Sequence, residues 1–366
     1  MAKNIRVGIT HGDFNGIGYE VILKALAEEG ITDLFTPVVF ADWRLIDHAR
    51  KSLNIEIQGL QRVSNASEAR DGAINIVDLR LADTTLEPGK PTKASGQGAI
   101  IALEKAVEAV EAGDIDVIVT APINKAAVQS DSFHFPGHTE YLEAKAGNDF
   151  HAQMILFDDR MRVALVTTHL PVSKISEAIT KEKVVDAITR LNATLRQDFG
   201  CDGPKIAVLS LNPHCGDDGL LGSEEQDVII PAIEEANQRK CLAFGPYAAD
   251  GFFGSGAYAD FDGIVAMYHD QGLAPFKALS GDDGVNFTAG LPFVRTSPDH
   301  GTAYDIAWQG VADPASMRTA IYKAIDIVRT RRNHQHASRN PLRKARADKP
   351  ADNRNDKTID LSKEEL

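Results

Sequence analysis

The stretch that decides the fold class is residues 7–41, VGITHGDFNGIGYEVILKALAEEGITDLFTPVVFA. Val7 to Thr10 form a short apolar run that is typical of a buried strand. A glycine-bearing turn separates this run from an amphipathic segment, which predicts a helix from about Glu20 to Glu28. A second apolar strand is expected near Thr36 to Ala41. Strand, helix and strand in this order favour a mostly parallel sheet covered by helices.

The same alternation continues along the chain, with one interruption in the middle. Further strands are predicted at about 74–79, 205–211 and 263–268, and helices at about 97–112, 183–199, 223–237 and 314–329. Residues 152–171, AQMILFDDRMRVALVTTHLP, instead look like two strands joined by a tight Asp-Asp-Arg turn. We therefore expect an α/β fold whose sheet is mixed and contains an antiparallel hairpin.

The last predicted helix marks the expected end of the folded unit. Its apolar residues lie along one stripe and are Met317, Ile321, Ile325 and Val328. Residues 333–366 have almost no apolar side chains, so they cannot bury enough surface to offset their ordering entropy. We expect residues 1–332 to form one α/β unit with two subdomains flanking a central cleft, and 333–366 to be a polar, flexible tail. The basic half of the tail could alternatively bind an acidic partner.

Composition excludes several classes of protein. A formal net charge of −13 argues against a nucleic-acid partner, because binding to a phosphate backbone needs a field of Lys and Arg. No apolar run is long enough to span a membrane and the N-terminus lacks the features of a signal peptide, so a cytoplasmic protein is expected. The three cysteines form no CxxC pair and fit a reducing compartment.

Three histidines stand just after predicted strands. His169 follows VALVTT, His214 follows IAVLSLNP and His269 follows GIVAMY. Open α/β sheets place ligand sites at the carboxyl ends of strands, and three neutral imidazoles suit Zn²⁺ or a similar ion with one position left open. Alternatively, each histidine only caps a strand or bonds a loop. Spacing alone does not show that the three converge.

A second group of side chains is suited to binding an anion. Its members are His138, Thr139, Lys277, Asn286 and Arg295. His138 and Thr139 precede a predicted helix, whose free N–H groups add affinity for anions. Lys277 and Arg295 could be solvated surface charges, but both lie in apolar, aromatic-rich stretches where an unpaired cation is costly. This placement favours phosphate or carboxylate binding.

Two glycine-containing loops leave their role open. The turn at 11–20, HGDFNGIGYE, lacks the GxGxxG spacing, so it is weak evidence for a Rossmann nucleotide site and could only permit a tight turn. The segment 299–314, DHGTAYDIAWQGVADP, is a small-residue loop with an Asp expected to be buried, and could wrap an adenosine moiety.

Seven segments together resemble the 4-hydroxythreonine-4-phosphate dehydrogenase family of vitamin B6 synthesis. They occur in the family's order between Val7 and Arg329: GITHGDFNGIGYEVILKAL, TAPINKAA, FPGHTEYLE, TTHLPVSKI, LNPHCGDDGLLGSEE, YHDQGLAPFKAL and DHGTAYDIAWQGVADP. NPHCGDDG and YHDQGLAPFK are the most specific strings. The loop HGTAYDIA is also similar to the cofactor loop of isocitrate and isopropylmalate dehydrogenases. That likeness implies their fold, a mixed sheet covered by helices with the active site in the cleft between two subdomains.

The resemblance also implies a role for each candidate residue. The implied metal ligands are His169, His214 and His269. The implied substrate contacts are His138, Thr139, Lys277, Asn286 and Arg295, and the implied cofactor contacts are His300, Gly301 and Asp305. Asp270 and Lys277 become the catalytic candidates, although Asp270 could equally orient the imidazole beside it. Zn²⁺ is the first expectation for the metal, with Mg²⁺ or Co²⁺ as alternatives. In the family the site lies between two subunits and the partner supplies the third histidine, which implies a homodimer.

The implied reaction is NAD- or NADP-linked oxidation of 4-phosphohydroxy-L-threonine to 2-amino-3-oxo-4-(phosphooxy)butanoate, which loses CO₂ to give 3-amino-2-oxopropyl phosphate. The nearest alternative substrate is a phosphorylated four-carbon sugar acid, 4-phospho-erythronate or threonate. More distant alternatives are a phosphate acetyltransferase and a non-catalytic protein that binds metal and phosphate. Phe14, Asn15 and Tyr19 depart from the family's usual Pro, Ala and Pro, and Trp308-Gln309 replaces the commoner Gly-Lys. The last departure leaves the choice between NAD and NADP open.

Overall fold

Twelve strands pair edge to edge in one sheet, in a computed structural model that describes residues 4–130 and 133–339. In spatial order the strands are β3 (Leu60–Val63), β4 (Ile74–Asp78), β2 (Thr36–Ala41), β1 (Arg6–Thr10), β5 (Val117–Thr120), β12 (Val294–Pro298), β11 (Val285–Ala289), β6 (Gln153–Phe157), β7 (Arg162–Leu165), β10 (Gly263–Ala266), β8 (Lys205–Leu209) and β9 (Leu242–Tyr247). Strands β1, β2 and β4 are almost fully buried, as expected for a parallel sheet covered on both faces.

The sheet is mixed, as predicted. Strand β1 pairs in parallel with β2 and β5, whereas β6 pairs antiparallel with both β7 and β11. The β6–β7 hairpin turns at Asp158, whose buried carboxylate accepts the backbone N–H groups of Arg160 at 2.8 Å and Met161 at 2.7 Å. An Asp that satisfies the backbone two and three residues ahead favours a tight turn. The predicted hairpin is therefore confirmed.

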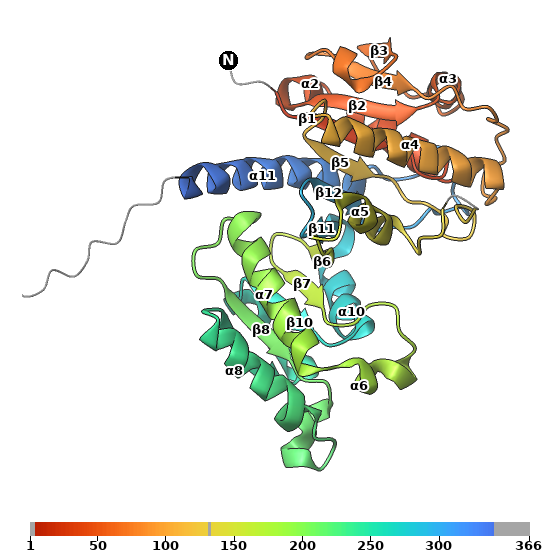
Figure 1. Cartoon of the computed structure of the whole chain (residues 1–366). Helices are drawn as coiled ribbons and strands as arrows, with labels where there is room; N and C mark the ends of the chain where they lie inside the picture. The colour runs from red at the N-terminus through yellow and green to blue at the C-terminus, as the bar shows by residue number, and fades with distance from the viewer. Residues whose placement is uncertain (1–3, 131–132, 340–366) are drawn as a thin grey trace, which may run out of the picture.

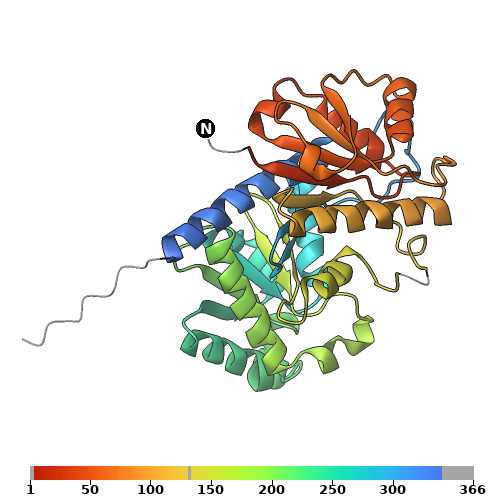
Figure 2. The same ribbon diagram turned by 45° about the horizontal axis from the view of Figure 1, so that its top comes forward.

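Helices cover the sheet in two groups. The helices are α1 (Gly18–Leu26), α2 (Ile31–Leu34), α3 (Trp43–Ser52), α4 (Lys93–Glu111), α5 (His138–Ala146), α6 (Ile175–Ala178), α7 (Lys181–Gln197), α8 (Ile230–Gln238), α9 (Ala249–Gly254), α10 (His269–Ser280) and α11 (Ala315–Ser338), with short turns η1 (Ala66–Glu68), η2 (Val172–Lys174), η3 (Pro213–Gly219), η4 (Glu225–Ile229), η5 (Ala257–Asp260) and η6 (Gly281–Asp283). One group surrounds β1 to β5, the other surrounds β7 to β10, and α11 lies along their junction (Figures 1 and 2). This arrangement suits two subdomains, which we retain as a prediction.

Helix α11 extends further than its sequence predicted. The expected stripe is buried, but the helix ends at Ser338 and not near Arg329, so the predicted end is wrong. The reason is a long-range ion pair. Arg331 is 6% exposed and its Nε donates to Oδ1 of Asp198 at 2.7 Å, which anchors the extra turns to the end of α7. The predicted boundary at residue 332 falls inside this helix, and residues 340–366 lie outside the described residues.

We predict that Arg331→Met destabilises the fold by about 3 kcal/mol, because it leaves the buried Asp198 carboxylate without its cation. The control is Lys105→Met, which removes an exposed partner of Glu108 and should cost under about 1 kcal/mol. Urea unfolding of both variants measures the difference. Equal losses would contradict an anchoring role for the Arg331 pair.

A buried histidine stands at the end of β1. His11 is fully buried, and its ring lies 5.1 Å from the ring of Tyr19 and 6.4 Å from that of Phe14, centroid to centroid. Burial lowers the pKa of His11 from 6.5 to about 4. The folded state therefore holds the ring neutral at a pH where the unfolded chain protonates it.

This pKa predicts a loss of stability in acid. Between pH 6.5 and about 4 the unfolded chain binds a proton at His11 that the folded chain does not, so the free energy of unfolding falls as the pH falls. His11→Leu removes this component. As the pH falls from 7 to 4, the free energy of unfolding of the variant should rise by roughly 3 kcal/mol relative to that of the parent. Urea unfolding measures this difference. His336→Gln, a substitution of an exposed histidine, is the control. A pH-independent difference between His11→Leu and the parent would show that His11 does not carry the effect.

Candidate active site

A cavity of about 320 Å³ opens at the carboxyl end of β5 and brings together most of the predicted site residues. The predicted residues that line it are His138, Thr139, His169, Lys277, Asn286, Arg295, His300 and Gly301. Lys125, Glu140 and Asp299 also line it and were not predicted. The whole predicted anion group therefore lies around one cavity, although its members come from four separate segments of the chain.

Arg295 is the most unusual charge of this cavity. It lies on β12 in the middle of the sheet and is 3% exposed. Its Nε and Nη2 donate to Oγ1 of Thr120 at 3.1 Å and 2.5 Å, and its Nη1 donates to Oγ1 of Thr288 at 3.0 Å. Both hydroxyls are neutral acceptors. No carboxylate of the described residues forms an ion pair with it. Burial lowers the pKa of Arg295 to about 10, which still leaves the guanidinium charged at neutral pH. The negative charge of Glu140 opposes this lowering of the pKa without forming an ion pair. A buried cation that lacks an ion-pair partner is costly, and an anionic ligand would reduce that cost.

His138 adds a neutral hydrogen-bonding group beside this cation. It is the first residue of α5 and borders the cavity. Burial lowers the pKa of His138 well below its usual value, and the positive charges of Arg295 and Lys125 lower it further. The ring is therefore uncharged at neutral pH. The cavity therefore contains at least two cations, Arg295 and Lys125, that act on the ring.

Lys277 and Asn286 face the same space. The Lys277 ammonium is half exposed and donates to Oδ1 of Asp299 at 2.8 Å. The side-chain oxygen of Asn286 on β11 is buried and accepts no hydrogen bond from the described residues. A buried amide oxygen without a donor is rare in folded proteins and suits a ligand that brings an O–H or N–H group.

Two of the three predicted metal ligands lie together. The rings of His169 and His269 are 5.9 Å apart, centroid to centroid, which suits two imidazoles that share an ion with Zn–N distances of about 2 Å. Within residues 4–130 and 133–339, no three His, Cys, Asp or Glu side chains form a metal-binding group. His214 therefore does not complete the set within one chain. It lies in η3, where five consecutive residues from His214 to Asp218 have positive φ. Its convergence with the other two stays a prediction.

Asp270 contacts one of these histidines. Its Oδ1 lies 2.7 Å from Nδ1 of His269, and its side chain is 83% exposed. This contact fixes the ring and leaves Nε2 of His269 for a ligand, as carboxylates beside metal-bound histidines commonly do. The geometry favours the orienting role over that of proton acceptor.

The segment 299–314 meets the cavity at one end only. His300 and Gly301 line the cavity, whereas Asp305 is exposed. The Asp of this segment that is largely buried is Asp299, whose side chain is 18% exposed and paired with Lys277. The inward side of the loop is taken by Tyr304, whose hydroxyl bonds Asp13, and by Ala307, which is 5% exposed. Asp305 therefore points to solvent, where it could still meet a ligand that lies on the outside of the loop.

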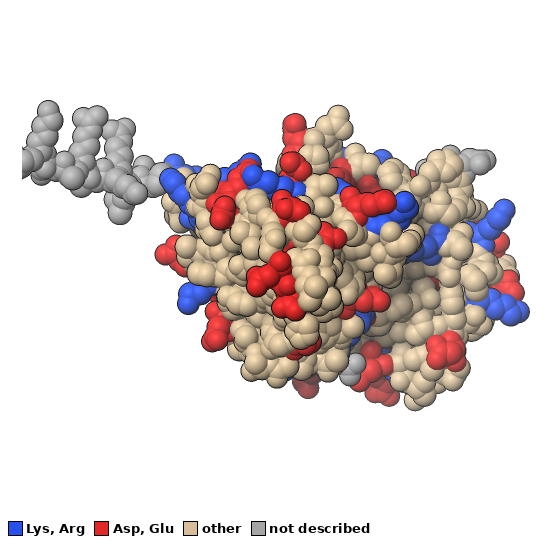
Figure 3. Space-filling view, turned by 90° about the horizontal axis from the view of Figure 1, so that it is seen from below, with Lys and Arg blue, Asp and Glu red and all other residues tan. Residues whose placement is uncertain are grey.

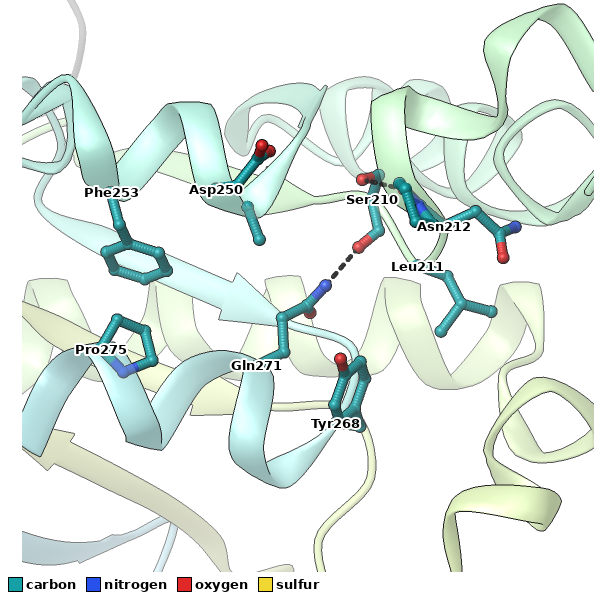
Figure 4. A pocket seen from close by; sticks show the side chains of 10 residues that line it. Ser210, Leu211, Asn212, Asp250, Phe253, Tyr268, Gln271 and Pro275 are labelled. Atoms are coloured by element: carbon teal, nitrogen blue, oxygen red, sulfur yellow. Dashed lines mark hydrogen bonds between the residues drawn. The ribbon is translucent and has the colours of Figure 1, made fainter. Parts of the chain in front are cut away.

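A second, larger cavity of about 510 Å³ lies between η3, α9 and α10. Figure 4 shows Phe253 and Pro275 at one end of it and Gln271 pointing toward Ser210. Nε2 of Gln271 donates to the carbonyl oxygen of Ser210 at 2.5 Å. Its one charged lining residue is Asp250. A negative charge does not suit an anionic ligand, so the smaller, basic cavity is the better candidate. On the face drawn in Figure 3, acidic and basic side chains are interspersed in small groups.

The protein has a mixed α/β sheet, a positively charged cavity at the strand ends and two adjacent imidazoles. These features define its class as an α/β protein with an anion-binding cavity. The comparisons with known proteins narrow this class. The model of the family described as "Pyridoxal phosphate biosynthetic protein PdxA" matches residues 33–324, and the chain belongs to this family.

Its relatives share both sequence and fold. The 4-hydroxythreonine-4-phosphate dehydrogenase of Bacteroides thetaiotaomicron is 53% identical over 345 residues, which cover 94% of each chain. A protein of Oceanobacillus iheyensis, provisionally named D-threonate 4-phosphate dehydrogenase, is 38% identical over 90% of this chain and 100% of its own. The crystal structure of 4-hydroxythreonine-4-phosphate dehydrogenase from Klebsiella pneumoniae matches with a TM-score of 0.78 and 34% identity, over 89% of this chain and 100% of that one. The predicted fold class and family are confirmed.

A branched-chain phosphotransacylase of Enterococcus faecalis matches with a TM-score of 0.51 at 14% identity, over 88% of this chain and 99% of that one. At this identity the likeness concerns the fold alone. It does not assign the chemistry of an acyl transfer to this chain.

We predict that Arg295→Met weakens the binding of inorganic phosphate by roughly tenfold to a hundredfold, since it removes charged hydrogen bonds to the anion. The unfolding temperature without phosphate should change little, because a buried unpaired charge disappears together with its bonds to Thr120 and Thr288. Calorimetric titration measures the binding. The control is Arg329→Met, which alters an exposed arginine of α11. Unchanged phosphate affinity in Arg295→Met would show that the anion binds elsewhere.

Proposed function

We propose that this chain is a metal-dependent, NAD(P)-linked dehydrogenase of 4-phosphohydroxy-L-threonine in pyridoxal 5′-phosphate biosynthesis. The product is 2-amino-3-oxo-4-(phosphooxy)butanoate, a β-keto acid that loses CO₂ to give 3-amino-2-oxopropyl phosphate. The observation that carries the proposal is the buried, unpaired Arg295 in a cavity that also contains Lys277, Lys125 and His138, beside His169. The family and the 53% identical relative support the same reaction.

The basic side chains fix the substrate through its phosphate. Arg295 and Lys277 supply charge, and the neutral ring of His138 and the hydroxyl of Thr139 supply hydrogen bonds. Holding this remote group orients the reacting carbon, so its binding energy serves catalysis. His169 and His269 would hold the divalent metal together with a histidine from a second copy of the chain. The metal, when bound, lowers the pKa of the substrate hydroxyl, and a nicotinamide coenzyme supplies the hydride acceptor.

Glu140 favours an amino-acid substrate over a sugar acid. It lines the cavity and forms no ion pair with the described residues, whereas Asp299 is paired with Lys277. The charge of Glu140 raises the pKa of Arg295. A carboxylate outside any ion pair also suits the substrate's ammonium group, which threonate and erythronate phosphates lack. The provisionally named D-threonate relative keeps the sugar acids as the second candidate class.

We further propose a homodimer, which would complete the histidine set, and a cytoplasmic location. Among residues 4–130 and 133–339, no helix combines the length and apolar character needed to cross a bilayer.

The test is absorbance at 340 nm with purified protein, a divalent metal, either coenzyme, and either the amino or the hydroxy acid phosphate. We expect metal-dependent reduction with 4-phosphohydroxy-L-threonine, abolished in His169→Ala because the metal loses a ligand. Glu140→Gln should raise KM for the amino acid about tenfold, since it loses a charged hydrogen bond, and leave KM for threonate phosphate unchanged.

A wild-type protein that reduces coenzyme only with threonate or erythronate phosphate would transfer the assignment to the second candidate class. A protein that holds metal and phosphate but reduces neither coenzyme with any of these substrates would contradict a dehydrogenase.

A further inference from the structure

The glycine-bearing turn after β1 is covered by the loop that follows β12. All ten residues from His11 to Glu20 are buried. The backbone N–H of Ile17 donates to the carbonyl of Thr302 at 3.1 Å, and Nε1 of Trp308 donates to the carbonyl of Phe14 at 2.9 Å. The turn is therefore a platform for the loop 302–312, and its inner surface is not open to a nucleotide.

Glycines make this close approach possible. A Cβ on Gly16 would lie 2.7 Å from the carbonyl oxygen of Thr302, and one on Gly89 would lie 2.7 Å from that of Tyr304. Both contacts are shorter than van der Waals distance to backbone atoms, which cannot move aside easily. Gly16 of the turn and Gly89 thus serve packing against the loop, whereas Gly12 and Gly18 approach the backbone of Pro122 and His11.

The far end of the loop is held by an ion-paired carboxylate. Glu20 accepts the backbone N–H groups of Gly310 at 3.2 Å and Ala312 at 2.8 Å, and Lys24 bonds both Glu20 and the carbonyls of the same two residues. Because Lys24 compensates the charge, this anchor needs no further function to account for it.

The near end is held by a carboxylate without a counter-charge. Asp13 is 1% exposed, and it accepts from the hydroxyl of Tyr304 at 2.8 Å, the hydroxyl of Ser95 at 3.0 Å and the backbone N–H of Asn15 at 2.9 Å. No Lys or Arg of the described residues pairs with it. A buried carboxylate is expensive, and an amide or an apolar side chain would fill this space at lower cost. Of its three contacts, the one with Tyr304 reaches the loop 302–312.

We propose that Asp13 is a positioning residue for the coenzyme: through Tyr304 it fixes the segment 300–305 before the coenzyme binds. The inference rests on the proposed function, because the predicted coenzyme contacts His300, Gly301 and Asp305 all lie on this segment. A loop that is already ordered loses less conformational entropy on binding, so the benefit appears as coenzyme affinity.

The test compares Tyr304→Phe with the parent enzyme. The substitution removes one hydroxyl and leaves the ring in place. We expect KM for the coenzyme and Kd for NADH to rise about tenfold, with kcat and KM for the phosphorylated substrate changed less than twofold, because the lost bond is to a charged acceptor that holds only the loop. Kd is read from the tryptophan fluorescence, since Trp308 lies in the loop and is one of two tryptophans in the chain.

Asp13→Asn should reproduce the coenzyme effect, and adding Tyr304→Phe to it should raise KM little further, because both changes break the same contact. The matched control is Ser95→Ala. It removes a donor to the same carboxylate oxygen from α4 without touching the loop. Ser95→Ala should lower the unfolding temperature yet leave the coenzyme KM unchanged.

Unchanged coenzyme KM and Kd in Tyr304→Phe, with an active parent enzyme, would overturn the positioning role alone. Equal rises in Ser95→Ala and Tyr304→Phe would also overturn it, because general loosening around Asp13 would then explain both. A parent protein that binds neither NADH nor NADPH would overturn the proposed coenzyme and this inference together.

Discussion

The hydrogen bonds between Arg295 and Thr120 join two strands on which the whole site depends. Thr120 ends β5 and Arg295 lies on the neighbouring β12, 175 positions later in the chain. The pairing of these strands connects the two groups of elements and places a positive charge in the interior of the sheet. The other cavity residues are arranged around that charge, so the fold and the binding chemistry share one constraint.

Buried polar groups divide into two kinds in this molecule. Asp198 with Arg331, and Glu20 with Lys24, are compensated by opposite charges and hold elements together. Among the described residues, Arg295 and Asp13 form hydrogen bonds with neutral groups only and take part in no ion pair. A fold tolerates such uncompensated charges at a loss of stability, and they are the groups for which a ligand or a positioning role is the best physical account.

The sequence predicted what depends on local pattern. Apolar periodicity located β1, β2 and the β6–β7 hairpin, and cations within apolar stretches identified Lys277 and Arg295. Features that depend on distant partners were not predictable in this way. Helix α11 continues past Arg329 because Arg331 meets Asp198, and Asp305 is exposed because Tyr304 takes the inward side of its loop. Lys125 was missed because its place beside His138 and Arg295 depends on the folded arrangement of distant segments, which no local pattern indicates.

The separation between β5 and β12 also bears on how the protein is made. A ribosome that has synthesised the chain through Thr120 has produced β1 to β5 but not the strand that covers β5, which comes only with residues 294–298. Until then β5 has an open edge, and pairing across so many residues is slow because a long loop must close first. The nascent chain is therefore expected to need protection of that edge while the residues between Thr120 and Val294 are synthesised, as a holding chaperone would give.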